Sequence, residues 1–208
     1  EVPADFRKEH GLSDKPLIAL LPGSRRQEIK SMLNEMVQMV ELFADHQFVI
    51  AGAPSVEEEF YQDLIRDFEL PPDRLKLVSG QTYNLVMEAE AALVTSGTAT
   101  LETALLGTPE VVCYKGSPIS YWLARRLVNV PYISLVNLIV EREVVRELIQ
   151  QELNRENLQR ELSAILDGAR RQEILQGYAE LRRRLGEPGA SARAGRLMVE
   201  RLQSSTHD

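Results

Sequence analysis

Short apolar runs recur along the first 114 residues, and each is followed by a turn and a stretch of helical periodicity. This alternation constrains the fold more than any other feature of the sequence. The runs do not alternate apolar with polar residues, which is typical of strands buried on both faces of a sheet. Strand–helix repeats joined by short turns favour a parallel sheet covered by helices on both faces. The sequence therefore predicts a Rossmann-like α/β fold, with strands over 16–21, 47–51, 75–78, 91–94 and 110–114.

Helical segments separate these strands and dominate the rest of the chain. Apolar residues at helical spacing, with a capping box at Ser55 and Glu58, predict helices between the strands over 25–40, 55–68, 82–89 and 96–107. Beyond Ser117 the pattern predicts helices over 118–129, 143–151, 155–166, 168–185 and 189–203. We interpret the chain as one domain, with a leading segment 1–15, an α/β core 16–150 and a helical carboxy-terminal annex 151–208.

Composition narrows the classes of protein that this chain can belong to. The net charge of −7 argues against a nucleic-acid binder that works through bulk positive charge. No apolar run approaches the roughly 20 residues needed to span a bilayer, and the first residues lack the features of a signal peptide. The single cysteine, Cys113, cannot form an internal disulfide. We therefore expect a cytoplasmic protein with no nucleic-acid partner.

The first strand ends in a turn with the chemistry of an anion site. Gly23 allows close backbone approach to a ligand, and Ser24 can cap the helix that follows. The exposed amide groups of that helix terminus favour an anion, and Arg25 or Arg26 can supply a charge-assisted contact to phosphate. The alternative is an ordinary strand-to-helix turn with a surface arginine pair.

The fourth strand opens into a second turn of this kind, Ser96-Gly97-Thr98. Glu102 follows about a turn and a half into the next helix, where its carboxylate can accept hydrogen bonds from the vicinal hydroxyls of a sugar. The alternative is a well-capped helix with a solvated glutamate. Because the carboxyl ends of parallel strands share one edge of a sheet, two phosphate-compatible turns with a carboxylate between them favour a nucleotide ligand.

Two further features leave alternatives open. The segment 114–130 is either an amphipathic helix that faces a membrane or a core helix whose arginines extend to solvent. Asn137 is a polar residue in an apolar stretch, and it needs partners from the backbone or from a ligand. No Asp-x-Asp motif or metal-ligand spacing occurs, and the three histidines belong to no motif, so we predict no metal site.

Three strings in this order carry a resemblance to a known family: LLPGSRRQEIK (20–30), TSGTATLETALLGTP (95–109) and YWLARRLVNVPYISLVNLI (121–139) followed by REVVRELIQ (142–150). The chain resembles lipid-A-disaccharide synthase over roughly residues 12–185. Enzymes of that family have two Rossmann-like halves, the GT-B architecture, and the resemblance covers only the carboxy-terminal, donor-binding half. It implies an inverting, metal-independent transfer of 2,3-diacylglucosamine from UDP to 2,3-diacylglucosamine 1-phosphate, with no cofactor.

The resemblance also implies roles for individual residues. Gly23, Ser24 and Arg25 would meet the diphosphate or the sugar that it carries, with Arg25 stabilising the leaving group. Ser96, Gly97 and Thr98 would line the same pocket, and Glu102 would bind the ribose. Asn137, Arg142 and Glu143 belong to the donor-proximal segment of the family. Where the family pattern has Ala-Gly, this sequence has Val140-Glu141, which puts close backbone approach to a diphosphate in doubt there.

The resemblance further implies partners that the chain itself does not contain. The general base and the acceptor site would lie on an amino-terminal half. Apart from the resemblance, the amphipathic helix predicted over 189–203 could dock on that half or on a second copy of the chain in a homodimer, and contact with the inner face of the inner membrane is a further possible interaction. Two alternatives remain: a related UDP-sugar enzyme of GT-B architecture such as an epimerase, and a non-catalytic UDP-binding or interaction domain. Stabilisation by UDP but not by AMP or NAD would favour the glycosyltransferase, and indifference to all three would favour the interaction domain.

Overall fold

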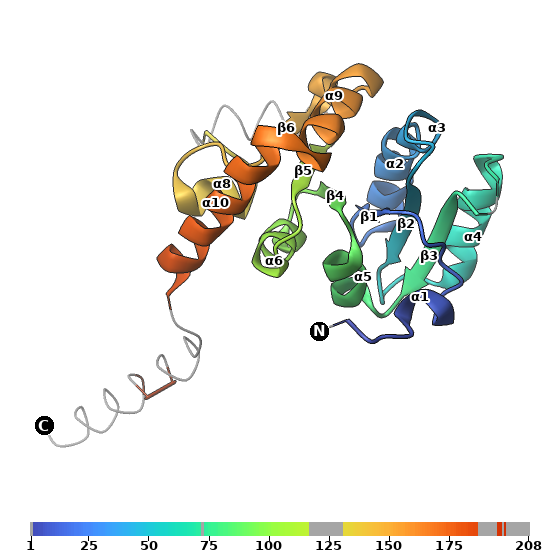
Figure 1. Ribbon diagram of the computed structural model, residues 1–208, viewed down its shortest axis with the longest axis horizontal. Coiled ribbons are helices and arrows are strands. Elements are labelled where there is room, and N and C mark those ends of the chain that lie inside the picture. Colours follow the sequence, from blue (N-terminus) through green and yellow to red (C-terminus); the bar gives the residue numbers. More distant parts are fainter. Residues whose placement is uncertain (1, 72, 117–130, 187–194, 197, 199–208) are drawn as a thin grey trace, which may run out of the picture.

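The computed structural model describes residues 2–71, 73–116, 131–186, 195–196 and 198 (Figure 1). Its strands are β1 (Leu17–Leu21), β2 (Gln47–Gly52), β3 (Leu75–Ser79), β4 (Ala91–Thr95), β5 (Glu110–Tyr114) and β6 (Arg146–Ile149). Its helices include α1 (Phe6–Glu9), α2 (Arg26–Met36), α3 (Met39–Leu42), α4 (Glu58–Asp67), α5 (Thr82–Glu88), α6 (Thr98–Leu106), α8 (Leu135–Val140), α9 (Arg155–Leu166) and α10 (Gly168–Leu185), with a 3-10 turn η1 (Gln150–Glu152). The predicted α/β fold is confirmed.

Within the described residues, six parallel strands form one sheet in the order β3-β2-β1-β4-β5-β6. From β1 the chain adds β2 and β3 on one side, and then crosses over to add β4, β5 and β6 on the other. Leu20 of β1 is therefore in register with both Ile50 of β2 and Leu93 of β4. The direction of winding reverses between β1 and β4, and in such sheets ligands bind beyond the carboxyl ends of the strands at that point.

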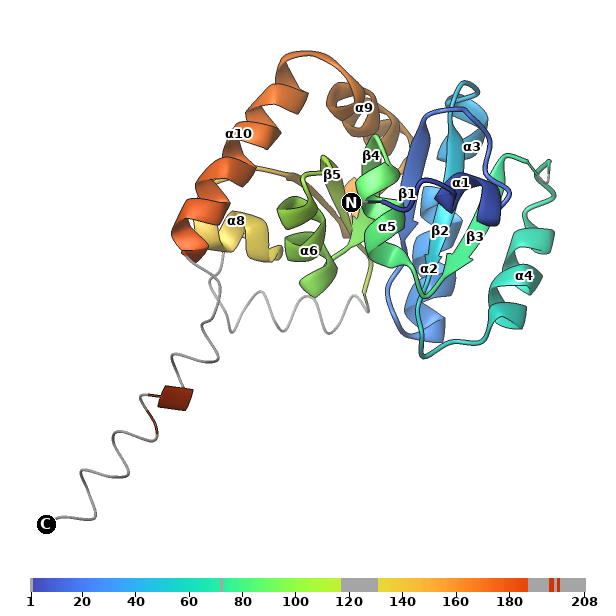
Figure 2. The same cartoon turned by 60° about the horizontal axis from the view of Figure 1, so that its bottom comes forward.

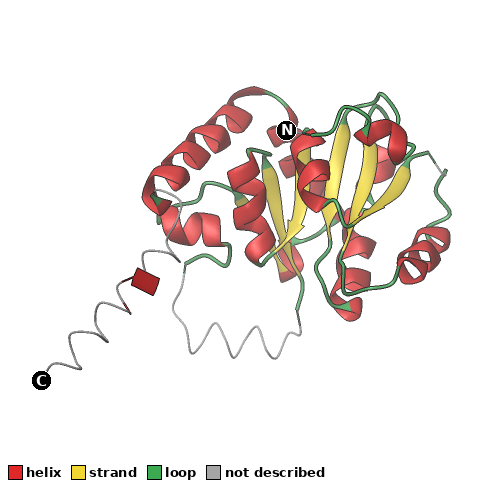
Figure 3. Cartoon of the chain, turned by 90° about the horizontal axis from the view of Figure 1, so that it is seen from below, coloured by secondary structure: helices red, strands yellow, loops and turns green. Residues whose placement is uncertain are grey.

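The sheet is buried on both faces because successive side chains of a strand point to opposite sides. Ile18 and Leu20 of β1 belong to a core cluster that includes apolar residues of α2, α3, α4 and α9. Leu17 and Ala19 of the same strand belong to a second cluster, which includes residues of α1 and α5. Helices accordingly lie on both sides of the strands (Figures 2 and 3). No helix among the described residues is both long and apolar enough to cross a bilayer.

One predicted helix is a strand. The segment 143–151 is rich in helix-forming residues, but Arg146–Ile149 pairs with β5 as the edge strand β6. Leu148 is fully buried there, and Glu147 is only 8% exposed, with its carboxylate accepting hydrogen bonds from Ile133, Ser134 and Asn137. Tertiary pairing has overridden local propensity at this edge. The helix predicted over 118–129 lies outside the described residues, as do most residues of the one predicted over 189–203.

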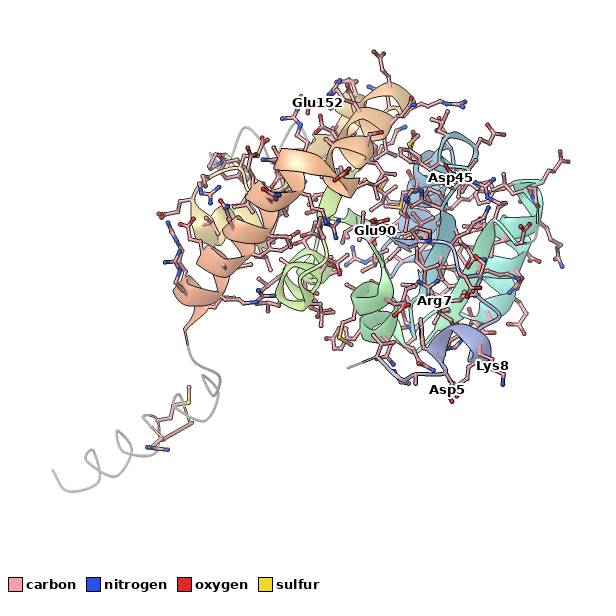
Figure 4. All side chains as sticks on the ribbon, viewed as in Figure 1. Asp5, Arg7, Lys8, Asp45, Glu90 and Glu152 are labelled. Carbon is pink, nitrogen blue, oxygen red and sulfur yellow. The ribbon has the colours of Figure 1, made fainter. Side chains whose placement is uncertain are left out.

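The last described helix of full length, α10, contacts α6, α8 and α9 (Figures 1 and 2). Four of its arginine side chains donate to backbone carbonyl groups of other segments. Arg182 reaches Leu105 at the end of α6, Arg184 reaches Ile139 in α8, Arg170 reaches Val144, and Arg171 reaches Glu90 and Ile165. At the other end of the chain, Arg7, labelled in Figure 4, pairs with Glu88 of α5 and donates to the carbonyl groups of Ser13 and Lys15.

Candidate functional site

The two turns predicted to bind an anion follow β1 and β4, which are neighbours in the sheet. Gly23 comes two residues after β1 ends, and Ser96 comes directly after β4. Both turns therefore lie at the carboxyl edge of the sheet and flank the point where the winding reverses. The structure brings the residues of these two turns to one place, as the sequence predicts.

At the first turn, the protein supplies a carboxylate of its own. Gly23 has φ of +106°, a conformation that side chains of L-residues rarely adopt. The carboxylate of Glu28 accepts a hydrogen bond from the backbone N–H of Ser24 at 3.2 Å. It also lies so close to Gly23 that a Cβ atom there would be 2.2 Å from Oε2 of Glu28. The residue at the N-cap of α2 is Arg25, and no side chain caps this helix, so the capping role predicted for Ser24 is wrong.

The two arginines of this turn differ in what they contact. Arg26 forms an ion pair with Glu57, and its guanidinium lies 5.2 Å from the ring centroid of Phe60. Arg25 is exposed, and it forms no ion pair or side-chain hydrogen bond with any residue that the structure describes. Arg25 is therefore the arginine of the pair whose guanidinium is available to an incoming anion.

At the second turn, the hydroxyl group of Ser96 donates to the carbonyl oxygen of Ile133 at 3.2 Å. The hydroxyl of Thr100 likewise donates to the carbonyl oxygen of Gly97 at 2.8 Å. The backbone N–H of Thr100 bonds to the carbonyl oxygen of Gly97 at 3.3 Å, whereas the N–H groups of Thr98 and Ala99 have no partner among the described residues, since the first N–H groups of a helix lack a partner within it. Gly97 has φ of 164°, which is ordinary extended backbone, and no atom lies within 4 Å of the position that its Cβ would take. Neither conformation nor packing in the free chain requires a glycine there.

A pocket of about 470 Å³ adjoins this edge of the sheet. Glu102 of α6 lines it together with Pro54, which follows β2, and with residues 80–84, which follow β3. Glu102 is half-buried, so its carboxylate is available to a ligand in the pocket. Among the described residues, no three His, Cys, Asp or Glu side chains gather in a way that would hold a metal ion.

Asn137 takes its partners from the protein. Its amide nitrogen donates to the carbonyl oxygen of Val145 at 2.8 Å and to the carboxylate of Glu147 at 2.9 Å. Its amide oxygen accepts from the backbone N–H groups of Val144 and Val145 at 2.8 and 3.0 Å. The side chain is fully buried and its hydrogen-bonding capacity is used, so we leave Asn137 out of the set of direct donor contacts.

Arg142 and Glu143 lie elsewhere than the two turns. They precede the amino end of β6, whereas Gly23 and Ser96 follow the carboxyl ends of their strands. Arg142 pairs with Glu180 at 2.8 Å, and Glu143 pairs with Arg146 at 3.3 Å. Because the structure does not bring them to the carboxyl edge, we also leave these two residues out of the donor contacts.

Sequence reasoning missed Glu147, which was included in a predicted helix. Its carboxylate accepts hydrogen bonds from Ser134 and Asn137 and from the backbone N–H of Ile133. The available signal was an Arg146-Glu147 pair between the apolar residues Val145 and Leu148, and it does not distinguish a buried carboxylate from a solvated one.

Comparison with known proteins identifies the family to which this chain belongs. The sequence profile of the family described as lipid-A-disaccharide synthetase matches residues 4–200. The chain belongs to this family. It is 42% identical over 203 residues to lipid-A-disaccharide synthase of Myxococcus xanthus (strain DK1622), which covers 95% of this chain and 52% of the relative. The corresponding enzyme of Syntrophus aciditrophicus (strain SB) is 40% identical over 197 residues, covering 92% and 51%. The chain thus spans about half the length of the curated relatives that it matches.

Solved structures share the fold of this family member at low sequence identity. The co-structure of S. aureus MnaA with UDP has a TM-score of 0.60 at 15% identity, covering 98% of this chain and 49% of that one. The glycosyltransferase VinC in complex with DTDP has a TM-score of 0.56 at 13% identity, covering 95% and 44%. Each of these chains is about twice as long as the part that matches, as expected if the match is to one of two halves.

The departure from the family pattern at Val140-Glu141 lies away from the two turns. Glu141 ends α8 in the left-handed conformation, with φ of 60° and ψ of 25°. Its side chain is exposed and pairs with Arg184 at 3.2 Å. A glycine at this position fits the left-handed end of a helix without strain. In the described structure the replacement therefore acts at the end of α8.

Proposed function

We propose that this chain is the donor-binding half of a lipid-A-disaccharide synthase. In this proposal it holds UDP-2,3-diacylglucosamine, while an amino-terminal half holds 2,3-diacylglucosamine 1-phosphate and supplies the general base. The observation that carries the proposal is the placement of two anion-compatible turns on adjacent strands, at the point where the winding of the sheet reverses. The pocket lined by Glu102 lies at the same edge and can take the nucleoside.

The contacts of each part of the donor follow from the groups that are free. The diphosphate would accept hydrogen bonds from the unpaired amide groups at the start of α6 and from the exposed guanidinium of Arg25. Gly97 leaves open space for a phosphate oxygen to approach the backbone. The carboxylate of Glu102 would accept hydrogen bonds from the two ribose hydroxyls.

The chemistry of the transfer assigns this half one main task. The 6-hydroxyl of the acceptor attacks the anomeric carbon from the face opposite UDP, which inverts the configuration at that carbon. The bond from the anomeric carbon to the phosphate oxygen breaks, and its electron pair goes to the departing diphosphate. In this proposal the amide groups of α6 and Arg25 would lie where that charge grows, so they would stabilise the transition state. A base on the other half would take the proton of the hydroxyl group.

Binding at the first turn requires a rearrangement within the chain. The carboxylate of Glu28 accepts from the N–H of Ser24, which is the group that a phosphate oxygen would use. Two anions cannot share this position, so Glu28 must turn away when the diphosphate is bound there. The cost of that movement would reduce the affinity of the free chain for UDP.

Calorimetric titration of the chain with UDP, AMP and NAD tests the proposal. We expect measurable binding of UDP only. Glu102→Gln should weaken UDP binding by roughly 1.5–3 kcal/mol, since it removes charge-assisted hydrogen bonds to the ribose. Glu59→Gln, a matched change on the exposed surface of α4, should leave the affinity unchanged. Equal affinity for UDP in the Glu102 variant and the wild type would remove Glu102 from the site.

The second test concerns activity. The isolated chain should bind UDP without forming disaccharide, because a positioned base typically contributes 10²–10⁴-fold to the rate. Holding two substrates in attack geometry contributes roughly a further 7–11 kcal/mol. Incubation with both diacylated substrates, followed by chromatography of the lipids, measures this. Disaccharide at an ordinary enzymatic rate would mean that the 208 residues hold a complete active site, and the donor-half proposal would be abandoned.

A further inference from the structure

A buried hydrogen-bond network joins β6 to the start of α8. The carboxylate of Glu147 accepts from the backbone N–H of Ile133 at 2.9 Å, and from the N–H and the hydroxyl of Ser134 at 2.9 and 2.7 Å. It also accepts from the amide nitrogen of Asn137 at 2.9 Å. Ser134 and Asn137 are fully buried, and Glu147 forms no ion pair with any described residue. Four hydrogen bonds therefore hold this charge, and they fix the position of the chain at residues 133 and 134.

The network connects directly to the proposed donor site. Ile133 donates its N–H to Glu147, and its carbonyl oxygen accepts the hydroxyl hydrogen of Ser96 at 3.2 Å. The backbone N–H of Ser96 is also engaged, with the carbonyl oxygen of Cys113 at 3.1 Å. Ser96 therefore has no hydrogen left to donate to a phosphate. Its hydroxyl group instead ties the turn before α6 to the segment that Glu147 holds.

We infer that Glu147 is a positioning residue for the diphosphate site, and that it acts through Ile133 and Ser96. This inference rests on the proposed function. By fixing the carbonyl group of Ile133, Glu147 fixes the hydroxyl of Ser96 and with it the start of α6. The free amide groups after Ser96 are then held in the orientation that binds the diphosphate. Ser96 belongs to the site as a support for these amide groups, and it does not contact the phosphate through its hydroxyl hydrogen.

A double-mutant cycle separates this role from a direct contact, because residues that act in series show non-additive effects. The variants are Ser96→Ala, Glu147→Gln and the double variant, with Glu156→Gln as a matched change on the exposed surface of α9. The probes are UDP and uridine, titrated by calorimetry into the intact chain. The quantity compared is the ratio of the two dissociation constants, which reports the contribution of the diphosphate. Melting temperatures are measured in parallel.

Each single variant should reduce the preference for UDP over uridine roughly three- to tenfold, the range expected for loss of one hydrogen bond. The double variant should lose no more than the single ones, and Glu156→Gln should match the wild type. If the double variant lost the preference for UDP by the product of the two single fold-changes, the inference would be overturned, because Ser96 and Glu147 would then act independently. An unchanged preference in Glu147→Gln would also overturn it, whatever happens to the melting temperature.

A milder variant covers the case in which Glu147→Gln does not fold. Ser134→Ala removes one of the four donors to Glu147 and the N-cap hydrogen bond from the N–H of Asn137, and it keeps both backbone donors to Glu147. In the wild-type background, Ser134→Ala should reduce the preference for UDP over uridine. In a double variant with Ser96→Ala, it should not reduce that preference below the value for Ser96→Ala alone. An effect that persists beside Ser96→Ala would overturn the inference. Absence of UDP binding by the wild type would instead overturn the proposed function itself, so the two failures are distinguishable.

Discussion

Substitution of the glycine in the second turn should separate the stability of the fold from the binding of the donor. Gly97 has extended backbone with φ of 164° and open space around its Cβ position, so alanine fits without strain. Replacing glycine by alanine at such a position stabilises a protein by about 0.4–1 kcal/mol, because the unfolded chain loses freedom. For a chain of this size, the melting temperature of Gly97→Ala should rise by up to about 4 °C.

The same methyl group should interfere with a bound diphosphate. It would occupy the space next to the amide groups of α6 that the proposal assigns to phosphate oxygens. Loss of one charge-assisted hydrogen bond costs roughly 1.5–3 kcal/mol, so UDP should bind at least about tenfold more weakly. The affinity for uridine should not change, since the nucleoside lies in the pocket lined by Glu102.

Gly23→Ala provides the contrasting control. With φ of +106° and the carboxylate of Glu28 in contact, this glycine is required by the protein itself. The variant should lose about 1–3 kcal/mol of unfolding free energy before any ligand is considered. Thermal unfolding and calorimetric titration of both variants make the comparison. If Gly97→Ala binds UDP as tightly as the wild type, the diphosphate does not lie at the start of α6 and our assignment of this turn is refuted.

Three further predictions concern glutamates in different surroundings. Glu110 is fully buried, its two carboxylate oxygens have no partner among the described residues, and burial raises its pKa well above the ordinary value. The unfolded chain releases the Glu110 proton at a lower pH than the folded chain does, so the free energy of unfolding should fall as pH rises above about 4.5. In urea unfolding, the stability of Glu110→Gln relative to the wild type should therefore increase between pH 5 and pH 8, and parallel pH profiles of the two proteins would contradict this. Both Glu141→Gly and Glu141→Ala lose the exposed pair with Arg184, but only glycine removes the strain of the left-handed conformation; urea unfolding should therefore show an unfolding free energy raised by about 1 kcal/mol in Glu141→Gly and lowered in Glu141→Ala. Glu28→Gln should tighten binding of UDP roughly two- to fivefold and leave uridine unaffected, because a competing charge leaves the N–H of Ser24; weaker binding of UDP would show that Glu28 supports the site.

Local patterns were sufficient to predict the central part of the fold. The strands β1 to β5 are mostly apolar runs, each with a glycine or a small polar residue at its end or within two residues beyond it, and such signals are short-range. Strand β6 was missed because Glu147 looks like a residue of a charged helix. It becomes acceptable in a strand only through donors on Ile133, Ser134 and Asn137, which precede it by ten or more residues. Sequence periodicity carries no information on such pairs.

The candidate site divides in the same way. The turns at Gly23 and Ser96 were predicted to share an edge because the rules of parallel sheets decide where strands end. The carboxylate of Glu28 over the first turn was not predicted, since a glutamate early in a helix ordinarily bonds to the amide group of the N-cap residue. Asn137 was recognised as a group in need of partners, and only the structure could choose between a ligand and the backbone.

The contacts of α10 have a consequence for how this chain tolerates sequence change. Its arginines recognise carbonyl oxygens at residues 105, 139, 144 and 90, which every amino acid provides. The residues that present these oxygens are therefore free to drift in evolution as long as the backbone keeps its course. The arginines are not, because each must extend a donor nitrogen to carbonyl oxygens at fixed positions on other segments, as Nη1 of Arg171 does for Glu90 and Ile165. The contacts of α10 thus depend on the course of the backbone, and substitutions of its arginines should be accepted much less often than substitutions of the residues whose carbonyl groups they bind.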